Sequence, residues 1–296
     1  MVILAILFFL LLGYVIFLEI RGRNLIKIVL TCLFVLLGFI IFKFENVDIF
    51  FYLTTIIVAN LFFLTYGIKK HFLFVALLLI LLPFANGIVF AQGIFLGILP
   101  GAMLMKGKNT KENKKLEMKR DGVHLAVGVV ILLLAYTFSF WGIFFIIALI
   151  ILGFALGNYI RLGKKQSFLS ELEREYTPFG YGAIWLALGI LLTLGFLFQA
   201  DYVFAVLSTI LIGDPIATIV GIIFGNKKLP YNKEKSIAGT AAFFFSTFLV
   251  SYFFLGYLAF AIALAAALVE SIDCKIDDNI LIPFFLVLII SFYYFV

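Results

Sequence analysis

The stretch that decides the fold runs from Leu211 to Thr240 and reads LIGDPIATIVGIIFGNKKLPYNKEKSIAGT. Asp214 interrupts an apolar run, and a charged side chain at membrane depth is costly and usually functional. A short basic loop follows, and then Ser236 and Gly239 open another apolar run. The stretch therefore predicts a membrane helix with a carboxylate inside it, a lysine-rich loop and a second membrane helix.

The composition of the whole chain indicates a membrane protein. Hydrophobic residues make up 65% of the 296 residues and charged residues 13%. In soluble domains about half of the residues are apolar and about a quarter are charged. Many apolar runs approach the roughly 20 residues that a helix needs to cross a bilayer, and no segment has the alternation of a transmembrane barrel. The expected fold class is all-α, a polytopic helical membrane protein with about twelve transmembrane helices.

A basic segment divides the expected spans into about five before it and about seven after it. Residues 1–105 are expected to form an accessory N-terminal bundle, residues 106–121 a basic cytoplasmic linker, and residues 122–296 the functional core. The expected spans lie near residues 2–18, 25–42, 49–67, 72–86, 88–105, 122–138, 141–160, 180–199, 202–224, 237–255, 256–271 and 279–296.

The positive charges give the expected orientation. When successive spans cross the bilayer in opposite directions, the basic segments fall on one side of the membrane. Among the lysines and arginines, only Lys43 falls on the other side. Lysine and arginine mark cytoplasmic loops, so the loops after the core spans are expected in the cytoplasm and both termini outside. The net charge of +6 therefore needs no nucleic-acid partner. The two cysteines lie on unrelated segments and predict neither a disulfide framework nor a metal cluster.

Asp214-Pro215 predicts a broken helix. Proline cannot donate a backbone hydrogen bond inside a helix and is favoured in the first turn, and aspartate is a favoured N-cap. We therefore expect a new half-helix to start at Pro215, beside a cavity. Small residues follow Gly213 at intervals of four, namely Ala217, Gly221 and Gly225. The alternative interpretation is that the stripe only packs helices together and that Asp214 acts only as a cap.

Two polar segments after the stripe could bind a metal-bound phosphate. Lysines of residues 226–235, among them Lys227 and Lys235, precede a helix start at Ser236–Thr240, where backbone N–H groups and the helix dipole attract anions. Residues 270–283, ESIDCKIDDNILIP, carry carboxylates that suit Mg²⁺. Glu270, Asp273 and Asp277 share one face if the helix continues that far. The plain alternatives are an ordinary cytoplasmic basic loop and a solvated acidic loop.

Taken together, these segments lie on one side of the bilayer and predict phosphoryl transfer to a lipid. The charged loop at residues 161–181 and the two histidines, His71 and His124, are read as interfacial and receive no role.

The chain resembles the polyprenol kinase family, which contains dolichol kinase, phytol kinase and CTP-dependent diacylglycerol kinases. The resemblance covers roughly residue 119 to the C-terminus. Its motifs are K-R-x-x-x-H at 119–124, R-E-x-x-x-x-G at 174–180, G-D-P-I-A-T-I-V-G-I-I-F-G at 213–225, K-S-I-A-G-T at 235–240, V-E at 269–270 and D-D-N-I-L-I-P at 277–283.

The resemblance implies transfer of the γ-phosphate of CTP, supplied from the cytoplasm, to the hydroxyl of a lipid alcohol from the bilayer. It implies catalytic roles for Asp214, Glu270 and Asp278. The residues expected at the nucleotide are Gly221, Gly225, Lys227, Lys235, Ser236, Gly239 and Thr240. The residues expected at Mg²⁺ are Asp214, Glu270, Asp277, Asp278 and Asn279.

Two other functions remain open. A cytidylyltransferase that makes a CDP-activated lipid would also use CTP and Mg²⁺, although its HGGxxDRxD block is absent. A transporter of an anionic solute could also contain a broken helix with an aspartate, but it should show an internal repeat, and neither the GDP nor the KSxxGT block recurs. The alcohol, which could be dolichol, phytol, geranylgeraniol or diacylglycerol, and the oligomeric state stay open.

Overall fold

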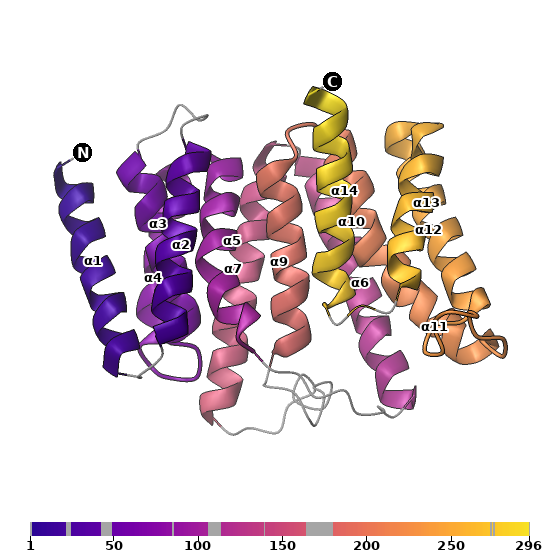
Figure 1. The fold of residues 1–296 in the computed structure, drawn as a ribbon, viewed down its shortest axis with the longest axis horizontal. Helices are drawn as coiled ribbons and strands as arrows, with labels where there is room; N and C mark the ends of the chain where they lie inside the picture. Colours follow the sequence, from indigo (N-terminus) through magenta and orange to yellow (C-terminus); the bar gives the residue numbers. More distant parts are fainter. Residues whose placement is uncertain are drawn as a thin grey trace. The chain divides into compact units, whose positions relative to one another are not determined.

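The computed structural model describes residues 2–21, 25–42, 49–84, 86–105, 114–138, 140–163, 180–272, 274 and 276–295. Every regular element in these ranges is helical, and their one β-pairing is an isolated antiparallel bridge between Lys228 and Ser236. The all-α prediction is therefore confirmed. The chain forms two compact units (Figure 1), of which the first holds Met1–Gly107, Ile147–Ser170 and Thr177–Tyr181 and the second holds Lys108–Ile146, Glu171–Tyr176 and Gly182–Val296.

The first unit is built around the pair α3 and α5. Glycines on α5 let the two backbones approach closely, since a Cβ on Gly97 would overlap the Ile56 carbonyl oxygen. Asn60 uses this proximity, and its side-chain Nδ2 donates to the Gly97 carbonyl at 3.2 Å. The helices of this unit are α1 (Val2–Arg21), α2 (Leu25–Phe42), α3 (Ile49–Leu64), α4 (His71–Leu81), η1 (Leu82–Phe84), α5 (Gly87–Met103) and the larger part of α7 (Phe140–Gly163).

The second unit contains the motifs that the sequence singles out. Its helices are α6 (Lys114–Phe138), the start of α7, α9 (Tyr181–Phe196), α10 (Ala200–Ser208), η2 (Thr209–Gly213), α11 (Asp214–Phe224), α12 (Ile237–Leu255), α13 (Leu258–Ser271) and α14 (Asp278–Phe295). The described part of the expected basic linker, residues 114–121, is the start of α6. Its Lys, Leu, Glu, Met and Arg residues are strong helix formers, which explains why it continues the helix.

The predicted break at Asp214-Pro215 is wrong. The chain stays helical from α10 to α11 through a five-residue π-helical segment, η2. Asp214 has right-handed helical dihedrals (φ −61°, ψ −52°) and is no extended N-cap, and its backbone N–H donates to the Thr209 carbonyl. A proline normally collides with the carbonyl four residues earlier, here Leu211. Widening the preceding turn to π geometry accommodates the proline without ending the helix.

The small-residue stripe of α11 packs against α12. A Cβ on Gly213 would overlap the Thr247 hydroxyl, and a Cβ on Gly239 would lie 2.9 Å from the Ala217 carbonyl oxygen and 3.4 Å from Gly221 Cα. The glycines therefore bring the end of α11 and the start of α12 into backbone contact. This contact sets the direction of the loop between the two helices.

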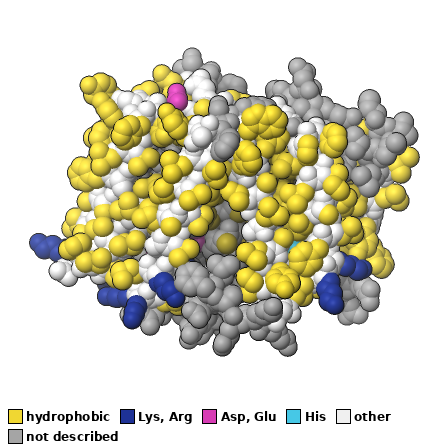
Figure 2. All heavy atoms as spheres, turned by 180° about the vertical axis from the view of Figure 1, so that it is seen from behind, with side chains coloured by type: hydrophobic (Ala, Val, Ile, Leu, Met, Phe, Trp, Pro, Cys, Tyr) yellow, Lys and Arg dark blue, Asp and Glu magenta, His cyan; other side chains and the backbone are white. Residues whose placement is uncertain are grey.

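Three of the described helical segments are long and apolar enough to cross a membrane, namely Trp141–Gly163, Ala200–Phe224 and Ile237–Leu255. Other apolar helices in the described ranges have 10–17 residues. Figure 2 shows hydrophobic side chains covering most of the face in view, with Lys and Arg side chains near its lower edge. This distribution is typical of helices that lie in a bilayer.

Candidate active site

The loop between α11 and α12 is an ordered hairpin. The backbone N–H of Leu229 donates to the Lys235 carbonyl at 3.1 Å, and the N–H of Ile237 donates to the Lys227 carbonyl at 3.0 Å. These bonds flank the bridge between Lys228 and Ser236. The hairpin places Lys235 directly before the start of α12.

Asn232 ties this hairpin to the end of α13. Its side chain is 3% exposed, and its Nδ2 donates to the Ser271 carbonyl at 3.0 Å. Its Oδ1 accepts the backbone N–H groups of Glu234 at 2.9 Å and Lys235 at 3.3 Å. The hydroxyl of Tyr231 adds a bond to Ser271 Oγ at 3.0 Å. Asn232 therefore positions Lys235, a role that the sequence reasoning missed.

The ammonium of Lys235 binds two carboxylates. Its Nζ lies 2.6 Å from Glu270 Oε1 at the end of α13 and 2.7 Å from Asp278 Oδ2 at the start of α14. The Thr240 hydroxyl, one turn into α12, donates to the other oxygen of Glu270 at 3.2 Å. These four residues, Lys235, Thr240, Glu270 and Asp278, are called the charged cluster below. Glu270 is 2% exposed, so its charge requires such partners.

The electrostatics of the cluster keep Lys235 protonated. Burial lowers the pKa of the Lys235 ammonium, but the carboxylates of Asp278 and Glu270 together outweigh that effect. The carboxylate of Asp214 on α11 also raises the pKa of Lys235. The pKa of Lys235 therefore lies above its ordinary value of 10.5. The Lys235 ammonium stays positively charged between the carboxylates of Glu270 and Asp278.

Asp214 belongs to the same electrostatic environment. Its carboxylate interacts with the charges of Lys235, Asp278 and Glu270, and also with that of Asp121 on α6. Asp121 is 6% exposed and its Oδ1 lies 3.4 Å from Arg120 Nε. Asp121 was not among the residues predicted for the site.

The predicted metal ligands divide into two groups. Asp278 and Glu270 converge on one point, where Lys235 Nζ now lies. Asp277 instead caps α14, because its Oδ1 accepts the backbone N–H of Asn279 at 3.1 Å and the Asn279 side chain at 2.9 Å. Asn279 Oδ1 is buried without a hydrogen-bond partner. In the described ranges no three His, Cys, Asp or Glu side chains are arranged to hold a metal ion.

The acidic segment does not form one helical face. The helix α13 ends at Ser271, and Ile272 is extended (φ −78°, ψ 137°). The shared face predicted for Glu270, Asp273 and Asp277 is therefore wrong, and Asp273 itself lies outside the described residues. Glu270 reaches the cluster from the end of one helix and Asp278 from the start of the next, which accounts for their convergence.

Several residues predicted at the nucleotide lie close together, where they cap α12 and pack α11 against it. Ser236 Oγ caps α12 by accepting the Gly239 N–H at 3.1 Å. The Thr240 N–H donates to the Ser236 carbonyl at 2.9 Å, so the backbone donors of Gly239 and Thr240 are engaged. A Cβ on Gly221 would meet Ser236 Oγ at 3.2 Å and one on Gly225 would meet it at 2.6 Å.

Lys227 lines a cavity beside the start of α12. The cavity has a volume of about 380 Å³ and is also lined by Asn226, Phe224 and the first turns of α12. His124 lies on α6, with its Nε2 buried and without a hydrogen-bond partner. The predicted motif at residues 174–180 falls almost wholly outside the described residues.

Comparisons with known proteins find relatives that are named as isoprenoid alcohol kinases. An uncharacterised protein of Methanocaldococcus jannaschii is 34% identical over 182 residues, which cover 59% of this chain and 93% of that protein. A chloroplastic protein of Triticum aestivum named a probable phytol kinase is 33% identical over 153 residues, 45% of this chain and 50% of its own length. The chloroplastic farnesol kinase of Arabidopsis thaliana is 40% identical over 95 residues, 26% of this chain and 31% of its own length.

The chain thus matches about half the length of the wheat protein and a smaller share of the Arabidopsis one. No family model matches the chain. No solved structure matches it either. Through its relatives named phytol kinase and farnesol kinase, the chain belongs to the polyprenol kinase family.

Proposed function

We propose that the chain is an integral membrane kinase that transfers the γ-phosphate of CTP to the hydroxyl of a long-chain isoprenoid alcohol of the dolichol or polyprenol type. The relatives named phytol kinase and farnesol kinase support an isoprenoid alcohol as acceptor. The observation that carries the proposal is the charged cluster, in which Lys235 binds Glu270 and Asp278 from two other helices. CTP as donor rests on the family resemblance alone.

The charges of the cluster suit phosphoryl transfer, because this reaction needs positioning and charge neutralisation more than covalent work by the protein. Lys235 offers three N–H donors and a permanent charge to phosphate oxygens. The hairpin that carries it is held by Asn232, so the charge is already in position before the nucleotide binds. A preorganised charge stabilises a transition state without a reorganisation cost at the moment of reaction.

The donor set also fits Mg²⁺. Oxygens of Glu270 and Asp278 lie within 2.7 Å of one ammonium, so both can reach one cation. Asn279, next to Asp278 in the sequence, has a buried side-chain oxygen without a hydrogen-bond partner. Mg²⁺ is usually held by one or two carboxylates together with substrate phosphates, and when bound it would neutralise charge on those phosphates. Lys235 would then exchange its carboxylate contacts for phosphate oxygens.

The proposed step forms a bond between the alcohol oxygen and the γ-phosphorus and breaks the bond from that phosphorus to the β,γ-bridging oxygen. CDP leaves, and the hydroxyl proton passes to a carboxylate. We assign this proton acceptor to Asp214, which interacts electrostatically with Lys235, Glu270 and Asp278 from the first turn of α11.

We further propose that about twelve helices cross the bilayer, with the charged cluster at the cytoplasmic side and both termini outside. The arrangement lets CTP reach the cluster from the cytoplasm while the alcohol arrives through the membrane. The lysines of residues 227–235 lie beside the cluster in the described loop, which supports a cytoplasmic position for it.

The test supplies purified protein with Mg²⁺, CTP labelled at the γ- or the α-phosphate, and a panel of farnesol, phytol, geranylgeraniol, dolichol and diacylglycerol. We expect only the γ-label to enter the lipid, as a monophosphate. Transfer of the α-label would instead indicate a cytidylyltransferase, and γ-labelled ATP in a parallel reaction decides the donor. Chelation of Mg²⁺ should abolish the transfer.

A pair of aspartate variants links the activity to the site. Asp278→Asn should lower kcat by about a hundredfold or more, because it removes a charge from the preorganised cluster. Asp201→Asn is the matched control, since Asp201 is an exposed aspartate in the first turn of α10 and lies outside the cluster. Equal activity of the two variants would contradict the assignment of the cluster.

A further inference from the structure

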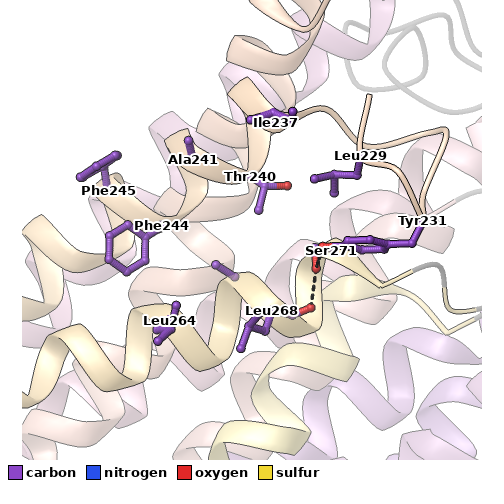
Figure 3. A pocket seen from close by; sticks show the side chains of 11 residues that line it. Leu229, Tyr231, Ile237, Thr240, Ala241, Phe244, Phe245, Leu264, Leu268 and Ser271 are labelled. Atoms are coloured by element: carbon purple, nitrogen blue, oxygen red, sulfur yellow. Dashed lines mark hydrogen bonds between the residues drawn. The ribbon is translucent and has the colours of Figure 1, made fainter. Parts of the chain in front are cut away.

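A groove runs between α12 and α13 below the hairpin (Figure 3). It has a volume of about 290 Å³, and its walls are formed mainly by Ala241, Phe244, Phe245, Leu264 and Leu268. Among the described residues that line it, there is no Lys, Arg, Asp or Glu. Several of its large apolar side chains are exposed, with Phe245 59% and Leu268 58% exposed. The groove is therefore suited to an apolar ligand that enters from the surrounding membrane.

One end of the groove reaches the charged cluster. Thr240 lines the groove and its hydroxyl donates to Glu270 Oε2 at 3.2 Å, while the other oxygen of Glu270 binds Lys235. The hydroxyls of Tyr231 and Ser271, which bond to each other at 3.0 Å, close the same part of the wall. A ligand in the groove would thus meet hydroxyl groups at one end and hydrocarbon along the rest.

We propose that this groove binds the acceptor alcohol, with the hydroxyl at Thr240 and the first part of the hydrocarbon chain between α12 and α13. The inference rests on the proposed kinase function and adds the binding site of its lipid substrate. An alcohol with one polar end and an apolar chain matches the distribution of polar and apolar groups in the groove. A nucleotide does not, because its phosphates would meet no cation among the lining residues.

The size of the groove indicates how much of the alcohol it holds. Sites that enclose a whole small molecule measure about 300–1,000 Å³. With about 290 Å³, the groove encloses only the part of the chain next to the hydroxyl, and the remainder extends along the apolar surface of the two helices. The site should therefore bind alcohols of different length through the same head portion.

The test uses an analogue of geranylgeraniol with a photoreactive diazirine on the second isoprene unit, mixed with purified protein in lipid nanodiscs without nucleotide. Mass spectrometry should locate the label on peptides of α12 and α13 that contain residues 241–245 and 264–268. Unlabelled geranylgeraniol should compete for this labelling. Label confined to other helices, or labelling without competition, would refute the groove as the binding site.

A matched pair of tryptophan variants strengthens the test. Ala241→Trp fills the groove and should reduce the competed labelling about tenfold, because the added side chain occupies the space that the alcohol needs. Ala261→Trp places the same side chain at an exposed position of α13 outside the groove and should leave labelling unchanged. Equal labelling of both variants would count against the groove.

The outcome separates the groove from the proposed function. Phosphorylation of the alcohol together with labelling elsewhere would refute the groove and leave the kinase proposal standing. Competed labelling in the groove without any phosphorylation would support the groove as a lipid-alcohol site and refute the kinase proposal.

Discussion

At the scale of single residues, the site depends on the partners that stabilise the negative charge of the buried Glu270 carboxylate. Glu270 is 2% exposed and receives a cation from Lys235 and a hydroxyl from Thr240. Asp278 is 24% exposed at its side chain and can be hydrated in part. The loss of Lys235 should therefore harm Glu270 more than Asp278, because a buried charge without a partner is strongly unfavourable.

We predict that Lys235→Met lowers the free energy of unfolding by about 3 kcal/mol, since it leaves the buried Glu270 carboxylate without a positive counter-charge. Adding Glu270→Gln in the same chain should recover part of that loss, because the buried charge is then gone. Melting temperatures in detergent measure both variants. Lys233→Met, in the same loop and exposed, serves as control and should melt like the parent. A double variant less stable than Lys235→Met would disprove the coupling.

At the scale of elements, the π-helical segment η2 explains how Asp214 is presented without a helix break. Pro215 cannot bond to the carbonyl of Leu211, and that carbonyl points toward α6, where a Cβ on Gly128 would lie 2.5 Å from its oxygen. The close approach of α6 to η2 therefore depends on the absence of a side chain at residue 128. The position of Asp214 relative to Asp121 on α6 depends on the same contact.

We predict that Gly128→Ala destabilises the protein by about 1–3 kcal/mol, because the new methyl group meets a backbone oxygen that cannot rotate away. Gly122→Ala provides the comparison on the same helix, since nothing lies within 4 Å of a Cβ there. That substitution should be neutral or stabilising by up to about 1 kcal/mol, from helix propensity alone. Similar melting temperatures for the two variants would contradict the close contact between α6 and η2.

At the scale of the whole molecule, the proposed function requires the charged cluster to face the cytoplasm. Cys274 reports on this directly, because it is exposed between the ends of α13 and α14, close in sequence to Glu270 and Asp278. The other cysteine of the chain, Cys32, lies within α2. Replacing Cys32 with serine leaves Cys274 as the single reactive thiol.

We predict that a membrane-impermeant maleimide labels the Cys32→Ser protein in inside-out vesicles and leaves it unlabelled in intact cells. A positive-inside arrangement of the loop lysines is the physical reason for this orientation. Permeabilised cells give the full extent of labelling as reference. Labelling of intact cells to that same extent would place the cluster outside and remove its access to cytoplasmic nucleotide.

Much of the architecture could be predicted because it depends on local properties. Long apolar runs form helices in a bilayer wherever they occur, and the residues of the K-S-I-A-G-T block lie at a helix start as expected. Other features could not be predicted in this way. A proline after an aspartate is compatible with a capped break or with a π-turn, and the choice depends on whether a neighbouring helix has room for the displaced carbonyl, which Gly128 provides.

The sequence by itself determined the helical membrane class and the polar residues that interrupt the apolar runs, because hydropathy and helix propensity act over a few neighbouring residues. Only the tertiary structure decided that Lys235 contacts Glu270, 35 residues away, and Asp278, 43 residues away. It also decided that Asn232 anchors the hairpin and that Thr240 joins the groove to the charged cluster. Such contacts depend on how helix ends are brought together by close packing at Gly221 and Gly239, which no local pattern specifies.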